Sequence, residues 1–248
     1  MRAARELRQA AVRRERGEFL AEGVRLVADA LALGARPRRV FVDRDRLTRS
    51  DGGRALLERL DPTTTIAIGD AAMEALADTR APQGVAAVFP TELTDRAAGP
   101  IVLVLDGLQD PGNVGTAIRS AVASGLVETV VVNGGADPFG PKAVRAAAAA
   151  LFAVRVARPT DDELPGLLRG REVWIAEAIG QRSYDAVDWR RPSALVIGSE
   201  ATGASPALRA LATGTVGVPL RGPIESLNAG VAASIILFEA ARQLNTTA

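Results

Sequence analysis

The residues that could do chemistry in this sequence fall into three polar clusters, and each cluster includes or follows an apolar stretch. The clusters occupy residues 106–125 (DGLQDPGNVGTAIRSAVASG), 194–205 (ALVIGSEATGAS) and 218–234 (VPLRGPIESLNAGVAAS). The chain contains neither histidine nor cysteine. We therefore exclude the usual zinc sites, thiol nucleophiles, disulfides and histidine bases. Any chemistry must use carboxylates, amides, hydroxyls, arginines or a bound cofactor.

The first cluster sets an asparagine and an arginine on one expected helix. Pro111 and Gly112 predict a turn, and Asn113 stands where a helix would begin. Arg119 shares a helix face with very small residues, because positions 112, 115, 119 and 123 are spaced by 3, 4 and 4. Small side chains let a ligand or another backbone come close. A tightly packed helix with one solvated arginine explains the same pattern.

The second and third clusters each place a polar side chain beyond a strand. Gly198 would let a ligand approach the backbone, and Glu200 could accept hydrogen bonds from a ribose or an amine. The helix dipole alone also favours an acidic residue there. In the third cluster a strand is expected to end at Pro219, Ser226 is a natural N-cap for the last helix, and Asn228 falls in its first turn.

Composition limits the classes of protein that fit. Hydrophobic residues make up 48% of 248 residues, enough for a sizeable core. Apolar runs are too short for a membrane span, and the charged N-terminus is unlike a secretion signal, so we expect a cytoplasmic protein. Residues 1–60 carry 15 arginines against 9 acidic residues. Such a surface suits RNA, although a solvated arginine-rich helix face explains it equally.

Two blocks are separated by a polar stretch bounded by prolines. We expect a substrate-binding unit at 1–90, a linker at 91–99 and a second domain at 100–248. In the first block the pattern predicts an arginine-rich helix, a helix within residues 18–34, strands at 38–43, 64–69 and 83–89, and a helix around 71–78.

In the second block apolar strands alternate with helices. Strands are predicted at 101–106, 129–134, 154–157, 172–178, 193–199 and 214–220, and helices at 112–124, 141–152, 162–170, 205–212 and 226–244. This alternation predicts an α/β fold with a parallel sheet covered on both faces. Ligands in such folds gather beyond the carboxyl ends of the strands. No G-x-G-x-x-G follows the first strand and no P-loop motif occurs, which argues against dinucleotide binding and P-loop phosphate transfer.

Together the three clusters resemble the motifs of the SpoU (TrmH-like) branch of the SPOUT methyltransferases. The matching patterns are N-x5-R after the first strand of this block, G-S-E after a later one and S-L-N at the last helix, within residues 101–244. The stretches EFLAEG and ALADTRAPQGVAAV resemble that family's RNA-binding domain, which is itself similar to a small ribosomal protein. The resemblance implies an RNA 2′-O-ribose methyltransferase that uses S-adenosylmethionine (SAM), with a deep C-terminal trefoil knot.

The resemblance also implies roles for individual residues. The residues that match the family's catalytic and structural polar set are Asn113, Arg119, Glu200, Ser226 and Asn228. Those expected to line SAM are Ala178, Gly198, Val218, Leu220, Ser226 and Leu227. Arginine keeps its proton, so we expect Arg119 to stabilise the developing alkoxide and to hold the adjacent phosphate, with Glu200 and Asn228 fixing its geometry. No metal is expected.

Some positions depart from the family pattern. Where the family has Arg-Ala-Ser-x-Gly, this chain reads RAAAAA from Arg145, so the arginine is retained and the serine and glycine are lost. Ala201 stands where a second glycine is common, and S-L-N continues with Ala-Gly. We expect an rRNA substrate and a homodimer that packs the last helix and the 112–124 helix near the active site. The alternatives are a tRNA 2′-O-methyltransferase and a catalytically silent RNA-binding protein that kept the fold.

Overall fold

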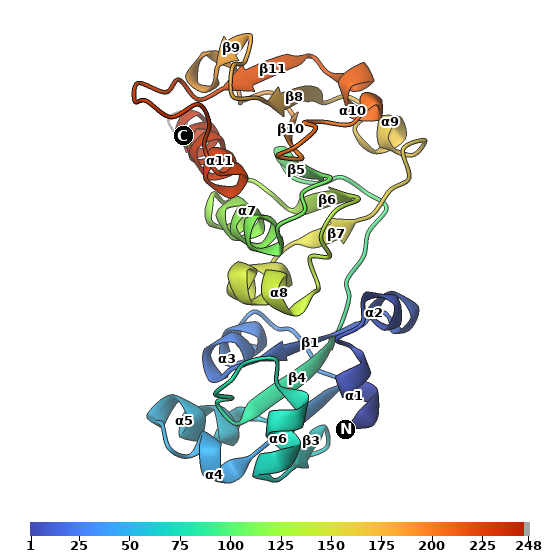
Figure 1. Cartoon of the computed structure of the whole chain (residues 1–248), viewed down its shortest axis with the longest axis vertical. Helices are drawn as coiled ribbons and strands as arrows, with labels where there is room; N and C mark the ends of the chain where they lie inside the picture. The colour runs from blue at the N-terminus through green and yellow to red at the C-terminus, as the bar shows by residue number, and fades with distance from the viewer. Residues whose placement is uncertain (246–248) are drawn as a thin grey trace.

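The structure, a computed structural model, describes residues 1–245 and contains two β-sheets built from separate parts of the chain (Figure 1). The first sheet has the order β1-β4-β2-β3 and is mixed, with β2 and β3 parallel and the other pairs antiparallel. Its strands are β1 (Glu18–Glu22), β2 (Arg39–Val42), β3 (Thr65–Ala67) and β4 (Val85–Pro90). The helices of this part are α1 (Arg2–Glu6), α2 (Ala10–Arg16), α3 (Val24–Ala32), α4 (Arg44–Leu47), α5 (Asp51–Arg59) and α6 (Asp70–Leu76).

One sequence prediction in this part is wrong over its first five residues. The segment 18–22, predicted as helix, forms strand β1, and only the part from Val24 onward is helical. Gly23 separates the two elements with a φ of 107°, a conformation that ends a strand and cannot continue a helix. β1 pairs along its length with the buried strand β4, so sheet pairing overrides the helical spacing of its apolar residues.

The second sheet confirms the predicted parallel α/β architecture. Seven strands, all parallel, take the order β7-β6-β5-β10-β8-β11-β9. They are β5 (Ile101–Asp106), β6 (Thr129–Asn133), β7 (Arg155–Ala157), β8 (Glu172–Ala176), β9 (Arg182–Ser183), β10 (Ser193–Gly198) and β11 (Gly214–Gly217). Strand β11 therefore ends two residues before Pro219, where the sequence predicted its end. The α-helices are α7 (Pro111–Ala123), α8 (Pro141–Ala147), α9 (Leu164–Leu167), α10 (Pro206–Leu211) and α11 (Ala229–Asn245), with 3-10 turns η1 (Ala148–Phe152) and η2 (Tyr184–Ala186).

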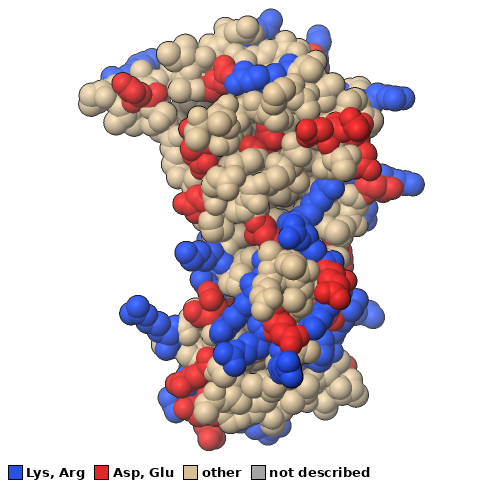
Figure 2. All heavy atoms as spheres, turned by 45° about the vertical axis from the view of Figure 1, so that its right-hand side comes forward, with Lys and Arg blue, Asp and Glu red and all other residues tan. Residues whose placement is uncertain are grey.

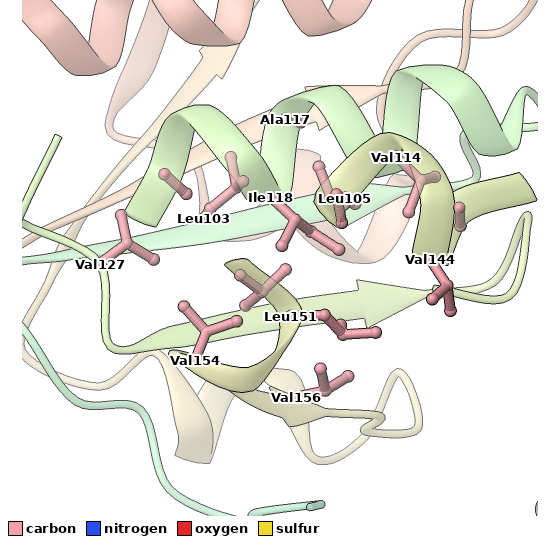
Figure 3. Close-up of a cluster of buried hydrophobic side chains, with 14 of the residues drawn as sticks. Leu103, Leu105, Val114, Ala117, Ile118, Val127, Val144, Leu151, Val154 and Val156 are labelled. Carbon is pink, nitrogen blue, oxygen red and sulfur yellow. The ribbon is translucent and has the colours of Figure 1, made fainter. Parts of the chain in front are cut away.

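Helices cover both faces of this sheet. α7, α8 and α11 lie along one face, and α9 and α10 lie beyond the other (Figure 1). Alternate residues of β5 therefore enter different cores: Leu103 and Leu105 pack toward α7, and Val102 and Val104 toward α10. Figure 3 shows the first core, where side chains of α7, α8 and η1 meet those of β5, β6 and β7. This packing fixes the strand ends that carry the polar clusters.

The predicted helix at 141–152 is interrupted. α8 ends at Ala147, and Ala148 has a φ of 52°, the single positive value among the non-glycine residues that the structure describes. The chain then continues as η1, which packs against α3 of the first part. A straight helix would carry residues 148–152 away from that contact, so docking of the two parts bends an alanine run that is otherwise strongly helix-forming.

The two parts meet in an aromatic and ionic junction. Phe19 of β1 lies 5.1 Å from Phe139 and 5.7 Å from Phe152, measured between ring centroids. The guanidinium of Arg13, whose residue is 5% exposed, donates from Nε and Nη2 to Asp137 at 2.8 and 2.6 Å. The retained Arg145 also crosses the junction, donating to Asp78 at 2.7 Å. Arg145 is thus an interdomain contact in this chain.

Basic side chains gather on the half of the molecule that contains α1 and α2, with acidic side chains among them (Figure 2). Several of these arginines are paired locally. Arg46 lies between Asp70 and Glu74, and Arg16 bonds Glu6. Within residues 1–245, others such as Arg14, Arg44 and Arg59 are exposed and form neither a side-chain hydrogen bond nor an ion pair. The arginine excess therefore leaves some cations available to a partner.

Candidate active site

A cavity of about 310 Å³ lies beside the carboxyl ends of β8, β10 and β11, where ligands of parallel sheets are expected. Segments after those three strands and the first turns of α11 form its wall. All six residues predicted to line a cofactor border it, namely Ala178, Gly198, Val218, Leu220, Ser226 and Leu227. Their role toward a cofactor stays a prediction, but the fold brings residues from all three C-terminal segments to one hollow.

Three of the predicted polar residues form a hydrogen-bonded chain at this cavity. Asn113 Nδ2 donates to Glu200 Oε1 at 2.7 Å, and Asn228 Nδ2 donates to Asn113 Oδ1 at 2.7 Å. Glu200 itself borders the cavity. The three clusters, 87 and 115 residues apart in sequence, therefore meet through a single asparagine on α7.

Asn228, rather than Ser226, caps the last helix. α11 begins at Ala229, and Asn228 Oδ1 accepts hydrogen bonds from the backbone N–H groups of Gly230 and Val231 at 2.9 and 3.2 Å. The predicted cap at Ser226 is wrong because the chain is still an irregular loop there. Asn228 thus has two structural tasks, since its oxygen caps the start of α11 and its nitrogen donates to Asn113. Ser226 is left exposed at the cavity wall.

Gly198 is required by the protein's own backbone. A Cβ at this position would lie 2.5 Å from the backbone nitrogen of Ala204 and the carbonyl carbon of Gly203. Ser199 and Gly203 close the intervening loop with reciprocal backbone hydrogen bonds of 3.0 and 2.8 Å. We expected the glycine to admit a ligand, and the structure shows that it first admits this loop, which carries Glu200 at its tip.

Arg119 lies apart from the cavity lining. It is exposed on α7, and among the described residues its guanidinium forms no hydrogen bond or ion pair, while Glu200 and Asn228 bond Asn113 instead. Gly115, on the same helix, faces α8, where a Cβ would lie 2.5 Å from Ala146 Cβ. Close packing against α8 therefore explains Gly115, and Arg119 is left free for a ligand.

The chemistry of the lining fits SAM. Apolar side chains such as Ile197, Val216 and Leu227 form much of the wall, and the charged groups in it are two carboxylates, Glu177 and Glu200. No arginine or lysine is among the lining residues. SAM combines a purine ring with ribose hydroxyls, a cationic sulfonium, and an ammonium that is offset by a carboxylate. Glu200 at this apolar hollow suits such a cation, whereas the charge of Glu177 is already paired with Arg209 at 2.9 Å.

Sequence reasoning missed Asp106, whose hydrogen bonds hold the loop beside the cavity. Its residue is 4% exposed, its Oδ1 accepts from Asn133 Nδ2 at 2.9 Å, and its Oδ2 accepts from the backbone nitrogen of Ser205 at 2.5 Å. Ser205 in turn caps α10. Asp106 therefore ties the loop that carries Glu200 to the end of β5. An acidic residue that closes an otherwise apolar strand was the available signal.

No helix in residues 1–245 is long and apolar enough to cross a membrane. Within the same described range, no group of three or more acidic side chains is arranged to hold a metal ion.

Comparison with known proteins places this site in a family. A family model described as the SpoU rRNA Methylase family matches residues 100–238, and one described as the MRM3-like substrate binding domain matches residues 1–87. The crystal structure of the SpoU methyltransferase AviRb from Streptomyces viridochromogenes in complex with AdoMet superposes with a TM-score of 0.86 at 32% identity, covering 98% of this chain and 96% of that one.

Curated relatives agree with that assignment. A 23S rRNA uridine 2′-O-methyltransferase of Streptomyces viridochromogenes is 32% identical over 92% of this chain and 83% of the relative. The 23S rRNA guanosine 2′-O-methyltransferase RlmP of Bacillus subtilis is 32% identical over 89% of this chain and 87% of the relative. The chain belongs to the SpoU rRNA methylase family, which confirms the resemblance found in its three motifs.

Proposed function

We propose that this protein is a SAM-dependent RNA methyltransferase that methylates a ribose 2′-hydroxyl in ribosomal RNA. The observation that carries the proposal is the convergence of the three SpoU motifs: six expected cofactor residues border one cavity, and Glu200, Asn113 and Asn228 are bonded in a chain beside it. The rRNA substrate follows from the activities named for the relatives and from the match of residues 1–87 to a substrate-binding domain.

The division of chemical labour follows from where the side chains lie. SAM, when bound, supplies an electrophilic methyl group, so the protein needs alignment and an activated oxygen. Residues of the cavity wall would hold the cofactor. Arg119 would bind the phosphate beside the target nucleotide and stabilise negative charge as it develops on the 2′-oxygen. Glu200 and Asn228 would act through Asn113, fixing the start of α7 on which Arg119 stands.

We further propose that the chain works as two units and a linker, with residues 1–90 binding RNA, 91–99 connecting and 100–248 carrying out methyl transfer. The separate sheets and the arginine excess of the first unit support this division. We also propose that the second unit has the deep trefoil knot that the family resemblance implies. The loops after β10 and β11 border the same cavity, which supports this proposal.

A homodimer completes the proposal. α11 exposes two large apolar side chains among the described residues, Val231 at 43% and Phe238 at 51%. α11 packs on α7, so a partner that covered these side chains would also lie near Arg119. Light scattering at micromolar concentration is expected to give about twice the chain mass of 25.8 kDa, and a monomeric mass would contradict the dimer.

Two measurements test the function. Calorimetric titration with SAM is expected to show saturable binding, and ribose methylation mapped in rRNA and tRNA from cells with and without the gene is expected to differ at an rRNA position. Such a substrate would place the protein in the cytoplasm with the ribosomes. SAM binding with a difference only in tRNA would favour a tRNA substrate. RNA binding without SAM binding would identify a catalytically silent protein that kept the fold.

A further inference from the structure

A second cavity, of about 220 Å³, lies where the two units and the linker meet. We call it the hinge pocket and define it by Arg13 and Arg14 of α2, Leu93 of the linker, and Asp137, Phe139 and Arg158 of the second unit. It exists only while the two units are docked, because neither unit alone supplies its walls.

The hinge pocket has an excess of positive charge. Asp137 is shared by two guanidiniums, since Arg13 donates to its Oδ2 and Arg158 Nη2 donates to its Oδ1 at 2.5 Å. Arg14 lines the pocket as a third cation, and among residues 1–245 no partner neutralises it. Three guanidiniums against one carboxylate form a site suited to an anion.

One donor in the pocket is buried without an acceptor. Arg158 Nε is inaccessible and forms no hydrogen bond, although its Nη2 binds Asp137. An unsatisfied buried donor is costly, so a phosphate that drew the Arg158 guanidinium toward the pocket, bringing Nε within reach of an acceptor, would remove that cost. Apolar surface lies beside these cations, because Leu93 is 58% exposed. The Arg158 guanidinium lies 5.9 Å from the centroid of the buried Phe139 ring. Arginine planes and apolar side chains are surfaces on which unpaired bases stack.

The hinge pocket and the active site lie on the same edge of the second sheet. Arg158 follows the carboxyl end of β7 and Glu200 follows that of β10, with β6 and β5 between these parallel strands. Three strand spacings separate the two ends by roughly 14 Å, a distance that a short single-stranded segment spans. A cavity of this size is below the range of about 300–1,000 Å³ for complete small ligands. It therefore fits one phosphate and part of its nucleotide.

We propose that the hinge pocket binds a phosphate and its unpaired nucleotide in the RNA strand that also carries the target ribose. This proposal rests on the RNA substrate of the proposed function. It makes the junction between the units a part of the RNA site, and Arg14 and Arg158 become substrate-binding residues.

The test measures binding of a labelled single-stranded oligouridylate to the full chain by fluorescence anisotropy at several salt concentrations. Arg14→Ala should weaken binding several-fold at low salt. It should also reduce the slope of log affinity against log salt by about 0.7, the value for one lost phosphate contact in single strands. Arg59→Ala is the matched control, because Arg59 is equally an exposed, unpaired arginine of the first unit but lies on α5, far from α2 (Figure 1). Its slope should equal that of the wild type.

A second variant separates charge from geometry. Arg158→Lys keeps the charge near Asp137 but removes Nε and the planar fork, so RNA affinity should fall while the salt slope stays the same. Equal slopes for Arg14→Ala and Arg59→Ala, or wild-type affinity in Arg158→Lys, would overturn the proposal. SAM titration of the same samples keeps the two hypotheses apart. A wild type that binds RNA but not SAM refutes the methyltransferase assignment and leaves the comparison of the arginine variants valid.

Discussion

Beside β8 and β11, the carboxyl edge of the parallel sheet forms a cavity whose charged lining residues are two carboxylates. Beside β6 and β7, the same edge forms a pocket lined by three arginines and one aspartate. One strand architecture thus offers two opposite electrostatic environments within a few strand widths. A cationic cofactor and an anionic substrate need such an arrangement. The active-site cavity, here called the acidic end of this sheet edge, lies within the second unit. The hinge pocket, the basic end, needs residues from both units.

The largest expected effect is a loss of methyl-transfer rate, without a loss of SAM binding, when Arg119 is replaced. If Arg119 acts on the RNA, Arg119→Ala should bind SAM normally but lose about 10²–10³ in the rate of methyl transfer, the usual loss when a stabiliser of a developing oxyanion is removed. Single-turnover methylation at saturating SAM is the measurement. Arg119→Lys should fail to restore the rate, because an ammonium lacks the planar fork. A SAM-binding defect in Arg119→Ala would instead assign this residue to the cofactor end.

The next prediction concerns Asp137, the carboxylate of the hinge pocket. Asp137→Ala leaves the buried Arg13 without its counter-ion, and losing one partner of a buried pair costs about 3 kcal/mol at the lower end of the known range. Denaturant unfolding should show this loss, while SAM affinity, set at the opposite end, should be retained. Asp29→Ala is the control, because its pair with Arg25 is exposed and should contribute less than about 0.5 kcal/mol. Similar losses in both variants would show that the junction pair is not special.

A third prediction divides the two tasks of Asn228. Asn228→Ala removes the helix cap and should lower the free energy of unfolding by about 1 kcal/mol. Asn228→Ser can still cap α11 but is too short to replace the amide nitrogen that donates to Asn113. It should keep near-native stability and lose methylation rate. Thermal unfolding and single-turnover rates together test this separation. Wild-type rates in Asn228→Ser would show that the bond to Asn113 is dispensable.

The parts of the fold that depend on local pattern were predictable from the sequence, and the contacts between units were not. Strand β5 was predicted with its observed bounds because its six residues, nearly all apolar, are followed directly by a turn signal. Segment 18–22 was predicted as helix because its pairing partner, β4, lies more than 60 residues away. Asn113, Glu200 and Asn228 were identified through motifs, yet their bonding order depends on where α7 and α11 begin. The hinge pocket escaped prediction because its arginines have no local signature that separates them from other surface arginines.

The last prediction concerns Ala148, which lies at the junction of the two units and lines neither pocket. Its φ of 52° is a conformation that costs a non-glycine residue on the order of 1–3 kcal/mol. A glycine removes this strain, but it lowers stability by roughly 0.4–1 kcal/mol because the unfolded chain gains conformational freedom. Ala148→Gly should therefore stabilise the protein by about 1 kcal/mol. Ala150→Gly, in the same 3-10 turn but without a positive φ, should instead destabilise it. Because neither alanine lines either pocket, SAM and RNA affinities should stay unchanged in both variants. If Ala148→Gly destabilised the protein as Ala150→Gly does, the bend between α8 and η1 would not carry strain. If it changed RNA affinity alone, the basic end would depend on the exact docking of the two units, and the acidic end would not.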